Sequence, residues 1–237
     1  MLKTKGIITA ILLALFFGAC RSDRDKVIIQ GNLENNIYKT IYLSKITPYG
    51  AFLIDSTEIR KGKFLFKVKT DECAACPVFY QLSLSQVNSM NTIAIGGDCL
   101  QIAADARILA KSYTIEGSDD AKRMFQLDRM LTAFIDTAES MRAFYEPYLE
   151  NDDMREYVES QYNDLLSQYN ENLIRFIKQN SHSMVSIPAF YQPRSRTQFL
   201  DEQENLDLLK LIYHDLREKY PDSEEVKFLE QRIRMNE

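Results

Sequence analysis

Hydrophobic and polar residues alternate with a period of two from Val27 to about Ile115. Such alternation places successive side chains on opposite faces of a β-strand. The segments are short, contain many Val, Ile, Tyr, Phe and Thr residues, and are separated by turn-forming residues: KVIIQGNL, TIYLSKI, FLIDSTEI, GKFLFKVK, VFYQLSL, NTIAI, LQIAAD and SYTIEG. In GKFLFKVK the buried face is expected to hold Phe64, Phe66 and Val68. We predict an antiparallel β-sandwich or small barrel of about eight strands over residues 27–117.

After Gly117 the apolar residues recur every three or four positions, which is the period of an amphipathic α-helix. Ser118 is placed to cap the first helix. Two apolar stripes follow, at Met124, Leu127, Leu131, Phe134, Ala138, Met141 and Tyr145, and at Met154, Val158, Tyr162, Leu165, Tyr169, Leu173 and Phe176. We predict two antiparallel helices joined near Pro147, with the second capped at residues 151–153. The fold class is therefore α+β, with a helical domain over residues 118–237.

The remaining sequence predicts shorter elements. Pro188 and Pro193 interrupt the chain, so this stretch is expected to form one short helix and a loop. Another helix is predicted between Leu206 and Tyr220. Asp222 with Glu225 three places on has the pattern of a capping box, which predicts a last helix.

The N-terminus, MLKTKGIITAILLALFFGAC, has the pattern of a secretory signal. Lys3 and Lys5 give it a basic start, and the apolar run over residues 7–17 is too short for a comfortable membrane span. Small residues then lead into Cys20 and resemble a bacterial lipobox. We expect residues 1–19 to be a lipoprotein signal peptide, with an ordinary cleaved signal or an uncleaved anchor as alternatives.

In a lipobox the cysteine is acylated and becomes the mature N-terminus. Lipid on Cys20 would hold the protein at a membrane, since each buried methylene contributes about 0.8 kcal/mol. Residues 20–26 then form the acylated cysteine and a polar tether. Arg21 follows the cysteine in place of the aspartate that retains lipoproteins in the inner membrane, so the outer membrane is the expected location.

The charge balance limits the classes of partner. Without Lys3 and Lys5 the chain has 27 basic and 34 acidic residues, a formal net charge of −7. An acidic chain without a basic stripe argues against nucleic acid as a partner.

Cys73 and Cys76, in ECAACPVFY, form either a redox-active pair or a structural disulfide. A catalytic pair of the thioredoxin type sits at a helix N-terminus, which lowers the pKa of the attacking thiol. Here Pro77 is followed by a predicted strand, and the carboxylates of Asp71 and Glu72 would raise a thiol pKa. The structural disulfide is therefore favoured, and thiol–disulfide exchange is kept as the alternative.

The remaining candidate residues do not define a catalytic or metal site. Cys99 is interpreted as a small buried residue, or as the partner of Cys73 or Cys76. Zinc needs four ligands, and His182 and His214 lie in the helical part, away from the cysteines. Both histidines are interpreted as surface residues, and we expect neither a metal nor a cofactor.

Several segments together resemble a known family: VIIQGNLEN, TIYLSK, LIDSTEIRKGKFLFK, FYQLSL, GGDCLQIAAD and SYTIEGSDDAKRM. They are similar to the N-terminal domain of unknown function in envelope thiol–disulfide oxidoreductases of diderm bacteria. In that family a β-rich domain and a helical segment, similar here to LREKYPDSEEVKFLEQRI, precede a thioredoxin-like domain. The most specific elements are IDSTEIRKGKFLFK and the junction at residues 115–118.

The resemblance implies the non-catalytic part of such a protein. The printed chain stops at Glu237, where the thioredoxin-like domain would begin, so the family's catalytic cysteines have no counterpart here. We expect a membrane-anchored envelope lipoprotein that acts as a non-catalytic binding or accessory module. Its partner would be an envelope protein or a separately encoded thioredoxin-like protein. The alternatives are thiol–disulfide exchange through Cys73 and Cys76, and a tetratricopeptide-like scaffold for an envelope partner.

Overall fold

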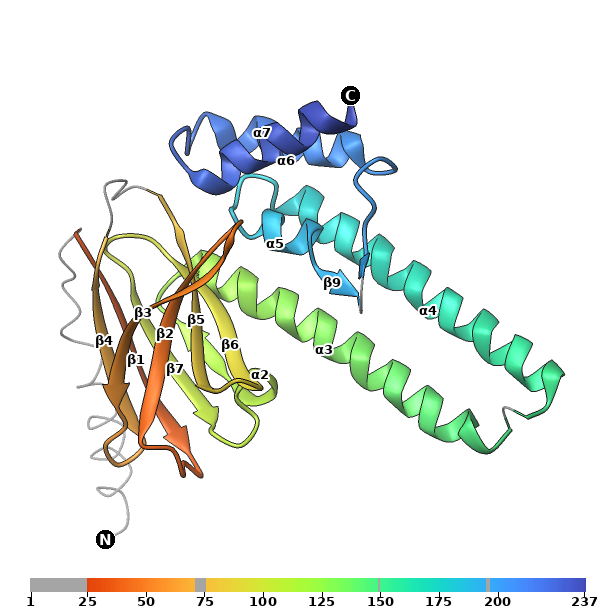
Figure 1. The fold of residues 1–237 in the computed structure, drawn as a ribbon, viewed down its shortest axis with the longest axis horizontal. Helices are drawn as coiled ribbons and strands as arrows, with labels where there is room; N and C mark the ends of the chain where they lie inside the picture. Colours follow the sequence, from red (N-terminus) through yellow and green to blue (C-terminus); the bar gives the residue numbers. More distant parts are fainter. Residues whose placement is uncertain (1–24, 71–75, 149, 195–196) are drawn as a thin grey trace, which may run out of the picture.

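The computed structural model describes residues 25–70, 76–148, 150–194 and 197–237. The predicted signal peptide, Cys20 and Cys73 lie outside the described residues. The described fold is α+β, with ten strands in mixed and antiparallel sheets and with helices toward the C-terminus. The sheets lie at one end of the molecule, and two long helices project from them (Figure 1).

The first sheet is mixed. Its strands lie in the order β4 (Lys63–Lys69), β1 (Lys26–Glu34), β7 (Cys99–Asp105) and β8 (Thr114–Glu116). Strands β1 and β4 are antiparallel, whereas β1 and β7 are parallel, with Ile29 opposite Leu100. The prediction of a purely antiparallel arrangement was therefore wrong for this pair.

The second sheet is antiparallel throughout. Its strands lie in the order β3 (Gly50–Glu58), β2 (Thr40–Thr47), β5 (Val78–Ser85) and β6 (Asn88–Ala94). The predicted number of strands between Val27 and Ile115 is thus confirmed. Among the strands that the structure describes, no sheet closes into a barrel.

One hydrophobic cluster contains residues from both four-stranded sheets. The first sheet contributes residues such as Ile29, Phe66 and Leu100, and the second contributes Ile41, Tyr80 and Leu82. In β4 the predicted alternation holds: Phe64 and Phe66 are buried and Val68 is half-buried.

The helical part begins with a long helical hairpin. Helix α3 (Asp119–Tyr145) and helix α4 (Asp152–Gln179) run in opposite directions and are joined by a short turn, η1 (Glu146–Tyr148), as predicted (Figure 1). The shorter helices α5 (Ser186–Phe190), α6 (Leu206–Arg217) and α7 (Glu224–Asn236) follow. Strands β9 (Pro193–Arg194) and β10 (Thr197–Gln198) pair where a loop was expected, and the one-turn helix α2 (Leu109–Ser112) was not predicted.

The helix caps confirm the predictions in part. The Asn151 side chain accepts a hydrogen bond from the backbone N–H of Met154, as expected for a cap. Ser118 is the N-cap of α3, although its side chain makes no capping bond. Helix α7 is capped by Ser223, not by Asp222 as predicted; the serine is the neighbour whose hydroxyl reaches the first turn.

Helix α3 follows β8 through a tight junction at Gly117. Gly117 has φ of +105°, and a Cβ atom built on it would lie 1.9 Å from the carbonyl oxygen of Cys99. Only glycine fits this position. Beyond the junction, Met124 and Leu127 share the helical cluster with Phe79 of the second sheet, so the hairpin is packed onto that sheet.

Partly buried polar contacts also hold the first half of α3. The Tyr113 hydroxyl donates a hydrogen bond of 2.6 Å to Asp128. Burial raises the pKa of Asp128, although the bond from Tyr113 and the charge of Arg129 act in the opposite direction. The Arg129 guanidinium lies 5.3 Å from the centre of the Tyr113 ring and 5.0 Å from that of Phe125.

A second polar cluster ties α7 to the segment after β10. The Glu202 side chain is only 8% exposed, and Arg232 donates to both of its oxygens at 2.8 and 2.5 Å. Asn236 donates a further bond of 2.9 Å to the same carboxylate. The cation that compensates this buried charge, Arg232, therefore comes from α7.

Candidate functional site

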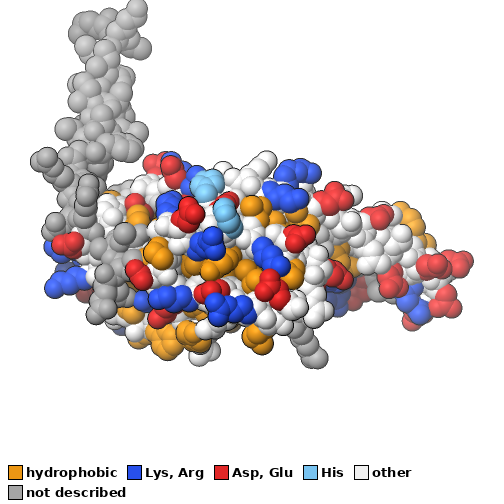
Figure 2. Space-filling model, turned by 90° about the horizontal axis from the view of Figure 1, so that it is seen from above, with side chains coloured by type: hydrophobic (Ala, Val, Ile, Leu, Met, Phe, Trp, Pro, Cys, Tyr) orange, Lys and Arg blue, Asp and Glu red, His pale blue; other side chains and the backbone are white. Residues whose placement is uncertain are grey.

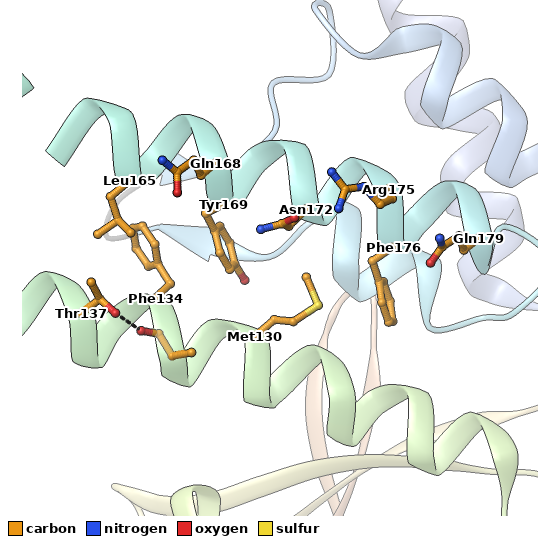
Figure 3. Close-up of a pocket in the computed structure, with 11 residues that line it drawn as sticks. Met130, Phe134, Thr137, Leu165, Gln168, Tyr169, Asn172, Arg175, Phe176 and Gln179 are labelled. Carbon is orange, nitrogen blue, oxygen red and sulfur yellow. Dashed lines mark hydrogen bonds between the residues drawn. The ribbon is translucent and has the colours of Figure 1, made fainter. Parts of the chain in front are cut away.

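A hollow of about 490 Å³ lies between α3 and α4. Figure 3 shows Met130 and Phe134 extending from α3, and Tyr169 and Phe176 extending from α4, into the space between the helices. These four residues belong to or border the apolar stripes of the two helices, and they give the hollow an apolar floor. The hollow suits an apolar side chain of a ligand.

Polar side chains of α4 line the other part of this hollow. They are Gln168, Asn172, Arg175 and Gln179, which recur at steps of four, three and four along one side of the helix. All four are exposed, and amide groups both donate and accept hydrogen bonds. Within the described chain no ion pair involves Arg175, whose cation is therefore available to a carboxylate.

The floor of the hollow is held rigidly from behind. The ring of Phe199 lies 5.2 Å from that of Phe134 and 4.6 Å from that of Tyr169, measured between centroids. The Tyr169 hydroxyl donates to the Gln192 side chain, and burial raises the pKa of Tyr169 well above its usual value. The hollow is thus preformed and carries no ionisable group in its floor that titrates near neutral pH.

The described residues do not include a site that contains the predicted cysteine pair. Cys76 is nearly buried just before β5, and Cys73 lies outside the described residues. Cys99 begins β7 and is half-buried near the side-chain amides of Gln30 and Gln101, whereas the first interpretation made it a small buried residue. Neither Cys76 nor Cys99 is a free thiol, and which cysteines pair stays a prediction.

The two histidines are not among the residues that line the hollow. His182 and His214 are both exposed, and His214 contacts Asp215 at 3.3 Å. The pKa of Asp215 is lowered, mainly by a hydrogen bond from Ser181. Among the described residues no group of His, Cys, Asp and Glu is arranged to hold a metal ion.

A wider hollow of about 950 Å³ lies over the first sheet and beside the end of β3. Its charged residues include Glu58 and Arg60, which pair with each other at 2.9 Å. Lys63 and Glu116 also line this hollow, and Phe64 is the one aromatic residue among its described lining residues, whereas the helical hollow is lined by the rings of Phe134, Tyr169 and Phe176. The hollow between α3 and α4 is therefore the better candidate.

The residues of this hollow were not predicted as a site from the sequence. Phe134, Tyr169 and Phe176 were expected only as members of apolar stripes, and Arg175 was not expected to have a role. The sequence does contain a signal for this site. Polar residues of α4 recur every three or four positions beside the apolar stripe, which places them along one side of the same helix.

Comparisons with known proteins found no match: no family model matches the chain, and neither does a curated protein or a solved structure. None of the helices in the described part of the chain has the length and apolar character needed to cross a membrane.

Proposed function

We propose that this protein is a lipid-anchored envelope protein that acts as a non-catalytic binding module through the hollow between α3 and α4. The observation that carries the proposal is the combination of a rigid apolar floor with an exposed polar stripe and the Arg175 cation. An extended segment of a partner protein matches this chemistry. Its backbone would pair with the amides, an apolar side chain would enter the hollow, and a carboxylate would face Arg175.

The anchor, the location and the relationship are part of the same proposal. The lipobox-like sequence before Cys20 supports a lipid anchor, and Arg21 supports the outer membrane. The segments quoted above support a relationship with the non-catalytic part of envelope thiol–disulfide oxidoreductases. We also propose that the two four-stranded sheets are the layers of a sandwich, which their shared hydrophobic cluster supports.

Site-specific photo-crosslinking in the envelope tests the binding role. A photoreactive residue at Gln168 lies in the hollow, and one at Asp164 lies on the same helix but outside the residues that line it. We expect a crosslinked adduct from position 168, its loss when Arg175→Glu is added, and none from position 164. Equal adducts at both positions, or none at 168, would contradict the proposal.

Thiol–disulfide exchange is the second candidate, and it is supported by the CxxC spacing of Cys73 and Cys76. Thiol trapping across a series of redox buffers distinguishes the two functions, with Cys99→Ser as the comparison. A reduction potential below about −300 mV indicates a structural disulfide. A reversible pair between roughly −120 and −270 mV, with disulfide reductase activity that depends on Cys73, would replace the binding module by a redox enzyme.

A further inference from the structure

The outer half of the α3–α4 hairpin holds a second hollow. It measures about 410 Å³, and its apolar lining consists of Ala138, Met141, Tyr145, Val158 and Tyr162. In the inner half the Phe199 ring covers the corresponding stripe. The described residues that line the outer hollow all belong to α3 and α4, and Arg194 of β9 approaches the stripe only at Tyr162, with its guanidinium 5.9 Å from the ring centre.

Exposed aromatic residues surround this outer hollow. Phe144 is 67% exposed, Tyr148 54% and Tyr157 48%. The Tyr145 ring, which lines the hollow, contacts Phe144 at 4.8 Å and Tyr157 at 5.9 Å between centroids, so these three rings form one aromatic cluster beside the hollow. Rigid exposed aromatic residues of this kind supply much of the binding energy at protein interfaces.

The same end of the hairpin is strongly acidic. Residues 139–159 contain seven acidic and two basic residues, a net charge of −5, which equals the formal net charge of the whole chain. Figure 2 shows acidic side chains gathered at the end of the molecule that corresponds to the hairpin tip in Figure 1. One of the two basic residues, Arg155, pairs with Asp152 at 2.7 Å. This charge repels anionic lipid and attracts a cationic surface.

We propose that the tip, defined as the outer hollow with Phe144, Tyr148 and Tyr157, docks a basic amphipathic helix of a partner protein. Two antiparallel helices whose apolar stripe is uncovered form a groove between them. A third helix can pack into this groove when the apolar residues on one of its faces point into it. The charged residues that line the hollow itself are balanced, Glu139 and Glu159 against Arg142 and Arg155. Basic residues flanking the apolar anchors would therefore meet the acidic rim formed by the other acidic residues between 139 and 159. This site is separate from the hollow around Arg175 and goes beyond the function proposed above.

Synthetic peptides test the proposal on the chain without its first twenty residues, which keeps every described element. The probe is an amphipathic peptide of leucine and lysine about 14 residues long, roughly four helical turns. The comparison peptides are a non-amphipathic arrangement of the same residues and an amphipathic peptide of leucine and glutamate. Binding is measured by isothermal titration calorimetry at low and high salt.

We expect only the leucine–lysine amphipathic peptide to bind, and its affinity to fall as salt screens the acidic rim. Phe144→Ala with Tyr157→Ala should weaken binding by about tenfold or more, as expected for aromatic anchors. Tyr49→Ala, an exposed aromatic residue in the β2–β3 turn, is the matched control and should leave binding unchanged.

Equal binding of the rearranged peptide, or an affinity unaffected by Phe144→Ala with Tyr157→Ala, would overturn the proposal. Arg175→Glu separates the two sites, since it should abolish the crosslink from position 168 and leave peptide binding at the tip intact. Binding at the hollow around Arg175 and helix docking at the tip can therefore be refuted independently of each other.

Discussion

Replacing Arg232 with alanine removes the cation that compensates a buried carboxylate. The Glu202 side chain is 8% exposed, and Arg232, itself 35% exposed, donates to both of its oxygens. In the variant Arg232→Ala the carboxylate stays buried and loses its charged partner. The free energy of unfolding should therefore fall by more than a surface ion pair is worth.

The structure limits how large this loss is. Removing one partner of a fully buried ion pair costs about 3–5 kcal/mol, because the remaining charge is left uncompensated. Here Asn236 keeps its 2.9 Å hydrogen bond to Glu202, and the exposed part of Arg232 leaves a path for water. We therefore expect a loss of about 2–3 kcal/mol at pH 7.

Arg234→Ala is the matched control, on the same helix and two positions away. Arg234 pairs with Glu230 at 2.5 Å, but the two side chains are 72% and 38% exposed. Exposed pairs four residues apart on a helix contribute about 0.3–0.5 kcal/mol. Urea unfolding, monitored by far-UV circular dichroism, should give a clearly larger loss in the free energy of unfolding for Arg232→Ala than for Arg234→Ala. Equal losses would refute the reasoning from burial.

The pH dependence supplies an independent check. Burial is the largest single influence on Glu202 and raises its pKa. The hydrogen bonds and charge of Arg232, together with the neighbouring Tyr191 and Asn236 side chains, outweigh burial, so the pKa of Glu202 is lowered. A carboxyl group with a lowered pKa in the folded state stabilises the protein above its unfolded pKa, about 4.3, and this stabilisation disappears as the pH falls through the folded value. The gap between wild type and Arg232→Ala should therefore narrow below about pH 4. A gap that does not change with pH would show that the loss comes from packing.

Three further substitutions test other parts of the fold. Gly117→Ala places a Cβ against a backbone carbonyl and should lower the thermal midpoint far more than Gly50→Ala, whose Cβ meets nothing within 4 Å; similar midpoints would contradict the tight junction. Asp128→Asn should raise the urea midpoint at pH 7, because the half-buried aspartate has a raised pKa and the folded protein loses stability as the pH rises through that pKa; the gain should vanish below about pH 4, and a gain at all pH values would refute this cause. Phe134→Ala should cost about 3–5 kcal/mol in urea unfolding, whereas Phe144→Ala at the surface should cost less than about 0.5 kcal/mol.

Local alternation was enough to predict the strands but not their pairing. Phe64 and Phe66 of β4 are buried as the pattern indicates, because each strand must place its apolar face against the core. The same pattern suits a parallel or an antiparallel neighbour. The parallel pairing of Ile29 with Leu100 depends on contacts about seventy residues apart along the chain, which no local window contains.

The candidate site shows a different limit. The apolar stripes that include Phe134 and Tyr162 correctly indicate two amphipathic helices, and the sequence alone does not distinguish covered from uncovered positions along each stripe. Phe199, far along the chain, covers only the inner half. Which half of the stripe stays uncovered therefore depends on tertiary packing, which the sequence pattern does not contain. The cap at Ser223 was missed for a local reason, because the adjacent Asp222 is a residue type that caps helices equally well.

The junction at Gly117 has a mechanical consequence. Helix α3 has 27 residues and is about 40 Å long, so it is a stiff rod between the tip and the sheets. Strand β8 immediately precedes it and is joined to β7 through three residue pairs only, at the edge of the first sheet. A pull on the hairpin tip would travel along the rod and peel this short edge strand away first. Under tension, rupture should therefore start at β8, while the longer ladders of the two sheets remain intact.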